Sequence, residues 1–176
     1  MDNNFFASPD WEKHLNYLKA TKQPINFRGV DVRILTPEQA TALNTVKIKS
    51  GICIAWDNPK QDLEPKLQEI VKYIKPYKLR CYVLIGFNST MDEDLHRINT
   101  LRKYNILPFV MVYKDYDNPK ERTPYQKDLA RWANNVFIFK KCLNFADYEP
   151  RKGFKCSAYF EKKNEETKEE TYTRQQ

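Results

Sequence analysis

Hydrophobic and polar positions along the 176-residue chain follow two alternating patterns. Short apolar runs recur every 27 or 28 residues, and they begin near Ile25, Ile52, Arg80, Leu107 and Asn135. Runs that are apolar on both alternating faces are typical of parallel strands covered on both sides, and the segments between them have the periodicity of amphipathic helices. One strand and one helix per unit predict repeated βα modules. We therefore expect an α/β fold with about four to five parallel strands.

Signals for helix starts fall at the same intervals. Three sequences match the capping box, in which a threonine and a Glu or Gln three residues later satisfy backbone amides at a helix start; they begin at Thr36, Thr90 and Thr123. Ser8 followed by Pro9 matches an N-cap with proline in the first helical turn. We predict a helix after Thr123 and further helices over residues 9–20, 37–46, 63–74 and 91–104.

Polar residues follow two predicted strands at their carboxyl ends, where α/β folds carry ligand sites. The strand over residues 51–56 ends in Asp57-Asn58-Pro59, and the strand that begins at Arg80 ends in Gly86-Phe87-Asn88. Asp57 can therefore be a functional side chain, although Asp, Asn and Pro are also the residues that turns favour. The sequence leaves both interpretations of Asp57 open.

The segment 25–35 is predicted to be a strand with one charged face, because aliphatic residues alternate there with Asp31 and Arg33. In a barrel, charges on the inward face of a strand are costly unless they are paired or bind a ligand. Asp31 and Arg33 are therefore either an ion pair or part of a polar site, and the sequence does not decide between the two.

Length and composition set the domain organisation. A chain of 176 residues with 41% hydrophobic residues can form one domain, which we assign to residues 1–148. Residues 149–176 form a basic and polar tail, and we expect disorder because aliphatic residues are almost absent from Glu161 onward. No apolar run approaches the roughly 18 residues of a membrane span, and the start of the chain lacks a signal-peptide pattern. We expect a cytoplasmic protein.

The net charge of +7 and the four cysteines narrow the candidate chemistry. Basic residues are spread along the chain without a nucleic-acid motif, which favours a solvated surface, although an anionic ligand or nucleic acid also fits the charge. The cysteines, at positions 53, 81, 142 and 156, form no CxxC pair, so we expect reduced structural thiols rather than a metal site. With two histidines in the chain, a histidine metal or acid–base site is not expected.

Several short sequences together resemble the later part of the core of a radical S-adenosylmethionine (radical SAM) enzyme. They are Asp2-Asn3-Asn4-Phe5, residues 31–36, Trp56-Asp57-Asn58, residues 82–90, residues 108–113 and Ala130-Arg131-Trp132. The resemblance covers roughly residues 2–148. In that superfamily a partial (β/α)6 barrel holds a [4Fe-4S] cluster on a CxxxCxxC loop after its first strand. The resemblance implies a partial, TIM-like barrel of parallel strands for this chain.

The resemblance also implies a site for S-adenosylmethionine. The two asparagines near the start of the chain match the loop that meets the methionyl amino group. The Asp-Asn pair after Trp56 matches a strand end near the ribose, and residues 85–88 match a strand end along the adenine. Arg33 matches a contact for the methionyl carboxylate or the substrate, because a guanidinium suits a carboxylate bidentately. The candidate cofactor-binding residues are Asn3, Asn4, Arg33, Asp57, Asn58, Gly86 and Asn88.

The chain departs from the family pattern because it contains no CxxxCxxC sequence. We therefore do not expect it to ligate the [4Fe-4S] cluster by itself. The resemblance predicts the C-terminal, cofactor- and substrate-facing half of a radical SAM enzyme of unknown substrate, inactive without a cluster-bearing N-terminal half. A truncated gene, an internal start or a split enzyme would explain such a chain. Open sheet edges tend to pair, so the expected partner is that missing half or a second copy of the chain.

A second class of function is compatible with the same residues. A non-catalytic binding or scaffold domain could keep the α/β core and lose the chemistry. Because the chain is basic and rich in aromatic residues, nucleic acid would be the first partner to test for such a domain.

Overall fold

The computed structural model describes residues 4–119 and 121–161. These residues belong to two compact units, Met1–Tyr113 and Lys114–Gln176, and each unit is described by itself. The first unit contains a sheet of four parallel strands in the order β1-β2-β3-β4. The predicted α/β class, with repeated βα units and parallel strands, is confirmed.

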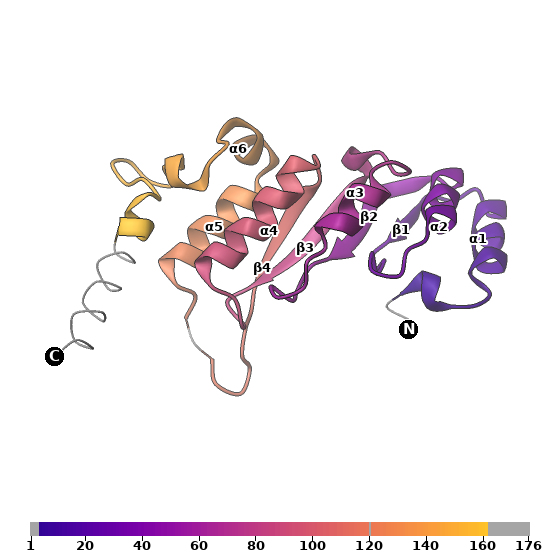
Figure 1. Ribbon diagram of the computed structural model, residues 1–176, viewed down its shortest axis with the longest axis horizontal. Helices are drawn as coiled ribbons and strands as arrows, with labels where there is room; N and C mark the ends of the chain where they lie inside the picture. Colours follow the sequence, from indigo (N-terminus) through magenta and orange to yellow (C-terminus); the bar gives the residue numbers. More distant parts are fainter. Residues whose placement is uncertain (1–3, 120, 162–176) are drawn as a thin grey trace. The chain divides into compact units, whose positions relative to one another are not determined.

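The elements of the first unit alternate between helices and strands. In chain order they are η1 (Phe5–Ala7), α1 (Trp11–Ala20), β1 (Ile25–Phe27), α2 (Pro37–Ala42), η2 (Leu43–Thr45), β2 (Ile48–Ala55), α3 (Glu64–Ile70), η3 (Pro76–Lys78), β3 (Leu79–Ile85), α4 (Met91–Lys103) and β4 (Leu107–Val112). Each strand therefore pairs with the next strand of the chain, with a helix between them. Because such crossovers are right-handed, successive helices lie on the same side of the sheet. In Figure 1, α3 and α4 cover the same face.

The two faces of β3 have different surroundings. Leu79, Cys81, Val83 and Ile85 are at most 1% exposed, whereas the three residues between them are partly exposed. The sheet was predicted to be covered on both faces, and this is wrong for β3 because the sequential order of the strands puts the covering helices on one side. We define the open face as the partly exposed residues of β3 and their register partners on β4, which are Arg80, Tyr82, Leu84, Leu107, Phe109 and Met111.

A buried arginine joins the carboxyl ends of β2 and β3 to α4. Arg97 is 0% exposed and donates hydrogen bonds to the backbone oxygens of Trp56 at 2.8 Å, Asp57 at 3.2 Å and Leu84 at 2.9 Å. It also pairs with Asp94 at 2.7 Å. A buried charge is tolerated when it is paired and its N–H groups find acceptors, and Arg97 meets both conditions.

Helix starts follow the sequence closely. All three predicted capping boxes are confirmed, at α2, α4 and α5 (Pro124–Asn134). The predicted cap at Ser8 is wrong, because α1 begins at Trp11 and Ser8 Oγ instead accepts a hydrogen bond from the Asp10 amide. Ser8 therefore stabilises the turn before the helix.

Two predicted strand segments are wrong. β1 ends at Phe27, and the following loop turns back at Asp31, whose carboxylate accepts a hydrogen bond from the Arg33 amide at 3.0 Å. Such local bonds compete with a strand ladder. The apolar run at Asn135 forms α6 (Val136–Lys141), because the Asn135 side chain accepts hydrogen bonds from the amides of Phe137 and Ile138.

The second unit contains α5, α6 and η4 (Phe145–Asp147). Residues 149–161, which fall in the predicted tail, include a β-bridge between Arg151 and Phe154. Tyr159 donates a hydrogen bond to the buried Asp128 at 2.6 Å and so ties this segment to α5. The rest of the predicted tail, residues 162–176, lies outside the described residues.

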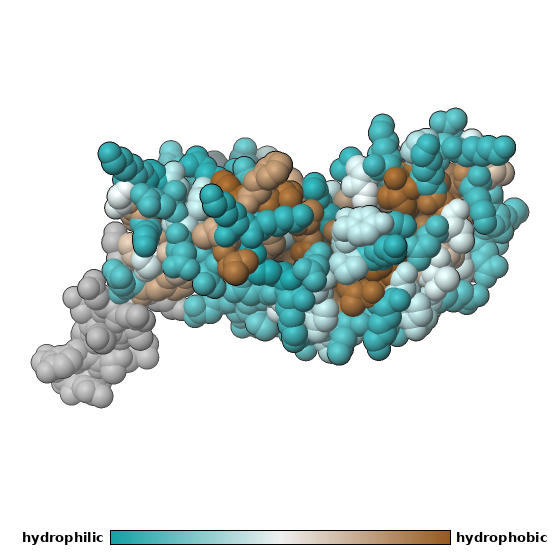
Figure 2. Space-filling model, turned by 90° about the horizontal axis from the view of Figure 1, so that it is seen from above, coloured by the Kyte–Doolittle hydropathy of each residue, from teal (hydrophilic) through white to brown (hydrophobic). Residues whose placement is uncertain are grey.

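Polar and charged residues dominate the surface seen in Figure 2, in keeping with the 30% of charged residues in the sequence. Within residues 4–119 and 121–161, no helix has the length and apolar character needed to cross a lipid bilayer.

We predict that Arg97→Met lowers the free energy of unfolding by about 3–5 kcal/mol, because Asp94 would remain buried without its partner. Urea denaturation of the full chain measures this change. Lys103→Met, on the same helix, removes an exposed ion pair with Glu64 and should cost less than about 1 kcal/mol. Equal losses for the two variants would contradict the role given to Arg97.

Candidate functional site

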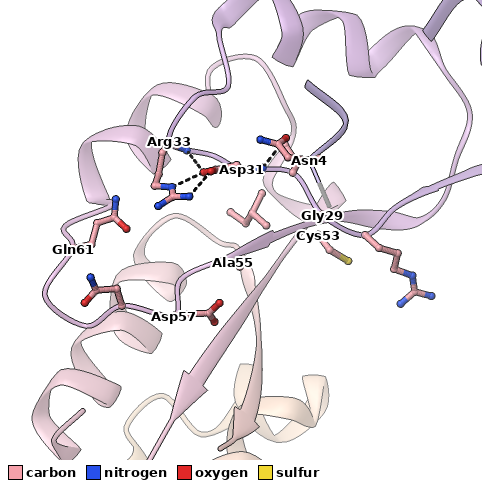
Figure 3. Close-up of a pocket in the computed structure, with 12 residues that line it drawn as sticks. Asn4, Gly29, Asp31, Arg33, Cys53, Ala55, Asp57 and Gln61 are labelled. Carbon is pink, nitrogen blue, oxygen red and sulfur yellow. Dashed lines mark hydrogen bonds and ion pairs between the residues drawn. The ribbon is translucent and has the colours of Figure 1, made fainter. Parts of the chain in front are cut away.

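A cavity of about 430 Å³ opens at the carboxyl ends of β1 and β2 (Figure 3). Carboxyl ends of neighbouring parallel strands meet at one edge of a sheet, so the loops that follow β1 and β2 both reach this cavity. Its floor includes the apolar residues Val30, Ile54 and Ala55. The polar residues that line it are Asn4, Arg28, Asp31, Arg33, Asp57, Asn58 and Gln61.

Asp31 and Arg33, in the loop after β1, form a bidentate ion pair. Arg33 Nε donates to Asp31 Oδ1 at 2.7 Å and Nη2 donates to Oδ2 at 2.5 Å. Hydrogen bonding from the Arg33 side chain lowers the pKa of Asp31 below its ordinary value. The sequence left open an ion pair or a polar site, and here the ion pair itself lines the cavity. Much of the charge of Arg33 is therefore already neutralised.

Asn4 reaches the same loop from the start of the chain. Its side-chain oxygen accepts a hydrogen bond from the Asp31 amide at 3.4 Å, which is long for such a bond. Residues that are 27 positions apart in the sequence thus meet at the cavity. This contact holds Asn4, the residue before η1, beside the loop after β1.

The loop after β2 carries Asp57 on the opposite side of the cavity from Arg33 (Figure 3). Its backbone is fixed at both ends, since the Asp57 oxygen accepts from Arg97 and the Trp56 indole donates to the Gln61 oxygen at 2.8 Å. Asn58 acts as a turn residue, because its side chain accepts from the Lys60 amide at 3.0 Å. The Asp57 carboxylate is thus carried on a rigidly held turn.

An ion pair connects this loop to the start of α4. Lys60 Nζ lies 2.5 Å from Glu93 Oε1, and Lys60 is the main cause that lowers the pKa of Glu93 to about 2. Glu93 is also the acidic member of the α4 capping box. The ion pair between Lys60 and Glu93 therefore persists through the neutral and mildly acidic pH range.

The structure brings together part of the predicted cofactor site. Four of its residues line the cavity, namely Asn4, Arg33, Asp57 and Asn58. Gly86 and Asn88 lie in the loop after β3 and do not line this cavity, and Asn3 lies outside the described residues. Gly86 has φ of 78°, a conformation that favours glycine, so its position also has a backbone explanation. Whether these residues bind a cofactor stays a prediction.

Sequence reasoning missed Arg28 and Gln61, which also line the cavity. Arg28 is the first residue after β1, a position at the carboxyl end of a parallel strand that could have drawn attention. Gln61 had no such signal, because its place depends on the fold of the loop after Trp56.

The side chains present fit one of the two groups that the family resemblance implies. The zwitterionic methionyl end of S-adenosylmethionine suits a lining of guanidinium, carboxylate and amide groups. The [4Fe-4S] cluster does not fit, because residues 4–119 and 121–161 contain no group of three His, Cys, Asp or Glu that could hold a metal ion. All four cysteines are free, and burial raises the pKa of the Cys81 thiol strongly.

We predict that Arg33→Gln raises the pKa of Asp31 toward its ordinary value of about 3.9. A lowered pKa stabilises the fold above the ordinary value, and this contribution is lost as the pH falls through the lowered pKa. The variant should lose that pH dependence. Carboxyl-carbon NMR titration of Asp31 measures the shift, with Arg122→Gln as a control of equal charge change. A midpoint that stays low in Arg33→Gln would assign the shift to another donor.

The arrangement amounts to a small polar cavity at the carboxyl edge of a parallel sheet, with the Asp31–Arg33 ion pair on one side and the Asp57 carboxylate on the other. Such a lining can orient a small zwitterionic ligand. No protein-family model, curated protein or solved structure matched this chain when it was compared with them.

Proposed function

We propose that this chain is the cofactor- and substrate-facing half of a radical SAM enzyme, completed by a cluster-bearing N-terminal half. One observation carries the proposal: four parallel strands in sequential order have helices on one face and a polar cavity at their carboxyl ends. A βα barrel divided between two chains would have these features in one half, and barrel ligands lie at that end of the strands.

The cavity supports S-adenosylmethionine as the ligand. A methionyl group carries a carboxylate and an ammonium, and the cavity has Arg33 on one side and Asp57 on the other. Arg33 uses its Nε and Nη2 groups on Asp31, so its Nη1 group would make the contact with a ligand carboxylate. The Asp57 carboxylate can accept hydrogen bonds from an ammonium or from ribose hydroxyls. Arg33 and Asp57 would not make these contacts with a ligand that lacked the carboxylate, the ammonium and the hydroxyl groups.

The sheet edges support a protein partner. β1 forms one edge of the sheet with three residues, and β4 forms the other edge. Unpaired edges are surfaces to which another strand can add, and closing a barrel removes them. The partner supplies the cluster ligands in this proposal, since the described residues hold no such group. The chain alone is therefore expected to bind the cofactor and to be inactive.

We predict that S-adenosylmethionine binds the isolated chain weakly and that Asp57→Ala or Arg33→Ala weakens the binding at least about tenfold. The reason is that each substitution removes a charge-assisted hydrogen bond, which is worth about 1.5 kcal/mol or more. Isothermal titration calorimetry measures the affinity. Because the expected binding is weak, the titration requires millimolar S-adenosylmethionine.

Asp10→Ala and Arg122→Ala serve as matched controls, since both residues are exposed and neither lines the cavity. The controls should bind like the wild type. Absence of binding to the wild type, or equal binding by all four variants, would overturn the proposed function.

A further inference from the structure

The open face of β3 and β4 presents two aromatic rings beside an arginine. Tyr82 and Phe109 are register partners on adjacent strands, and their ring centroids lie 5.5 Å apart with the planes at 83°. Both are partly exposed, and Met111, farther along β4 on the same face, is 37% exposed. Rings held by a sheet are preorganised, so Tyr82 and Phe109 present two apolar surfaces at a fixed angle to each other.

The charged residue of the open face and the arginine next to Tyr82 are both basic. Arg80 precedes Tyr82 on the same face, and Arg28 lies next to the Tyr82 hydroxyl, which raises the pKa of Arg28. None of the six residues of the open face is acidic, and neither arginine forms an ion pair with a described carboxylate. Ala55 is the β2 partner of Tyr82, so the neighbouring side chain on that strand is small.

We propose that the open face binds single-stranded nucleic acid, with one base stacked on Tyr82 and another on Phe109 and with phosphates held by the flanking arginines. Bases stack on aromatic side chains, and guanidinium groups pair bidentately with phosphate. The net charge of +7 favours the approach of a polyanion. This inference stands without S-adenosylmethionine binding, because none of the residues that carry it is needed for the proposed methionyl contacts.

Two other occupants fit this face less well. An apolar peptide would cover the rings but would bury Arg80 without an acceptor, which is costly. A second copy packed face to face would bury Arg80 of both copies, and the open face of neither copy offers a carboxylate to pair with it. Phosphate groups satisfy the arginines while the bases cover the rings, so a single strand uses both kinds of group.

We predict that a fluorescein-labelled single-stranded thymidine oligonucleotide of about 20 nucleotides binds the full chain in low salt, as followed by fluorescence anisotropy. Tyr82→Leu and Phe109→Leu should each weaken binding about tenfold, because leucine keeps the packing but removes the stacking surface. Arg80→Gln should reduce the slope of log K against log salt by about 0.7, the value for one lost phosphate contact on a single strand.

Matched variants separate stacking from general charge. Tyr17 and Tyr77 are 73% and 71% exposed and lie outside the open face, so Tyr17→Leu and Tyr77→Leu should bind like the wild type. Arg122→Gln, with the same charge change as Arg80→Gln, should leave the affinity nearly unchanged. A duplex of the same sequence should bind more weakly, since its bases are already stacked. Circular dichroism and thermal unfolding check that each variant folds.

Three results would overturn the inference: no binding in low salt, equal binding by the open-face and control tyrosine variants, or a dimer whose formation depends on Tyr82. Binding of S-adenosylmethionine is measured in a separate titration. Failure of one ligand to bind therefore does not change the result for the other ligand. Nucleic-acid binding without cofactor binding would support this inference and overturn the proposed function, and the reverse outcome would do the opposite.

Discussion

The hydrogen-bond network of Arg97 is the interaction on which the arrangement of the site depends. The Arg97 guanidinium donates hydrogen bonds to backbone oxygens at the ends of β2 and β3 and to the carboxylate of Asp94. Parallel strands leave such oxygens without ladder partners where the ladder stops, and buried backbone oxygens need a hydrogen-bond donor. The buried charge of Arg97 is favourable only while all of these hydrogen-bond acceptors keep their positions. The ends of β2 and β3, and the turn that carries Asp57, therefore hold their positions together.

The cavity depends on this framework but takes its electrostatics from local contacts. Asp31 and Arg33 are two residues apart and pair within one turn, so much of their charge is balanced before any ligand arrives. Arg28, the first residue after β1, also lines the cavity and forms no ion pair with a described carboxylate. The cavity therefore has Arg28 and Asp57 as charged residues outside the Asp31–Arg33 pair.

The one-sided coverage of the sheet connects the two proposals. Sequential parallel strands direct the crossover helices α2, α3 and α4 to the same side, which leaves the partly exposed residues of β3 and β4 on the other. In a closed barrel that side would be the interior, with the cavity at its mouth. The aromatic rings of the open face and the polar cavity at the strand ends would then share one interior, where a cofactor and a substrate could meet.

The sequence by itself determined the parallel βα repeat and the three threonine capping boxes, because strand periodicity and cap chemistry act over a few residues. It also predicted polar residues at the carboxyl end of β2, and Asp57 and Asn58 line the cavity there. The helix after Asn135 and the place of Arg28 had local signals, an asparagine cap and a position at the end of a strand, which the periodicity of the chain did not show. Tertiary structure alone decided that β3 is covered on one face and that Gln61 reaches the cavity, because both outcomes depend on contacts between residues far apart in the chain.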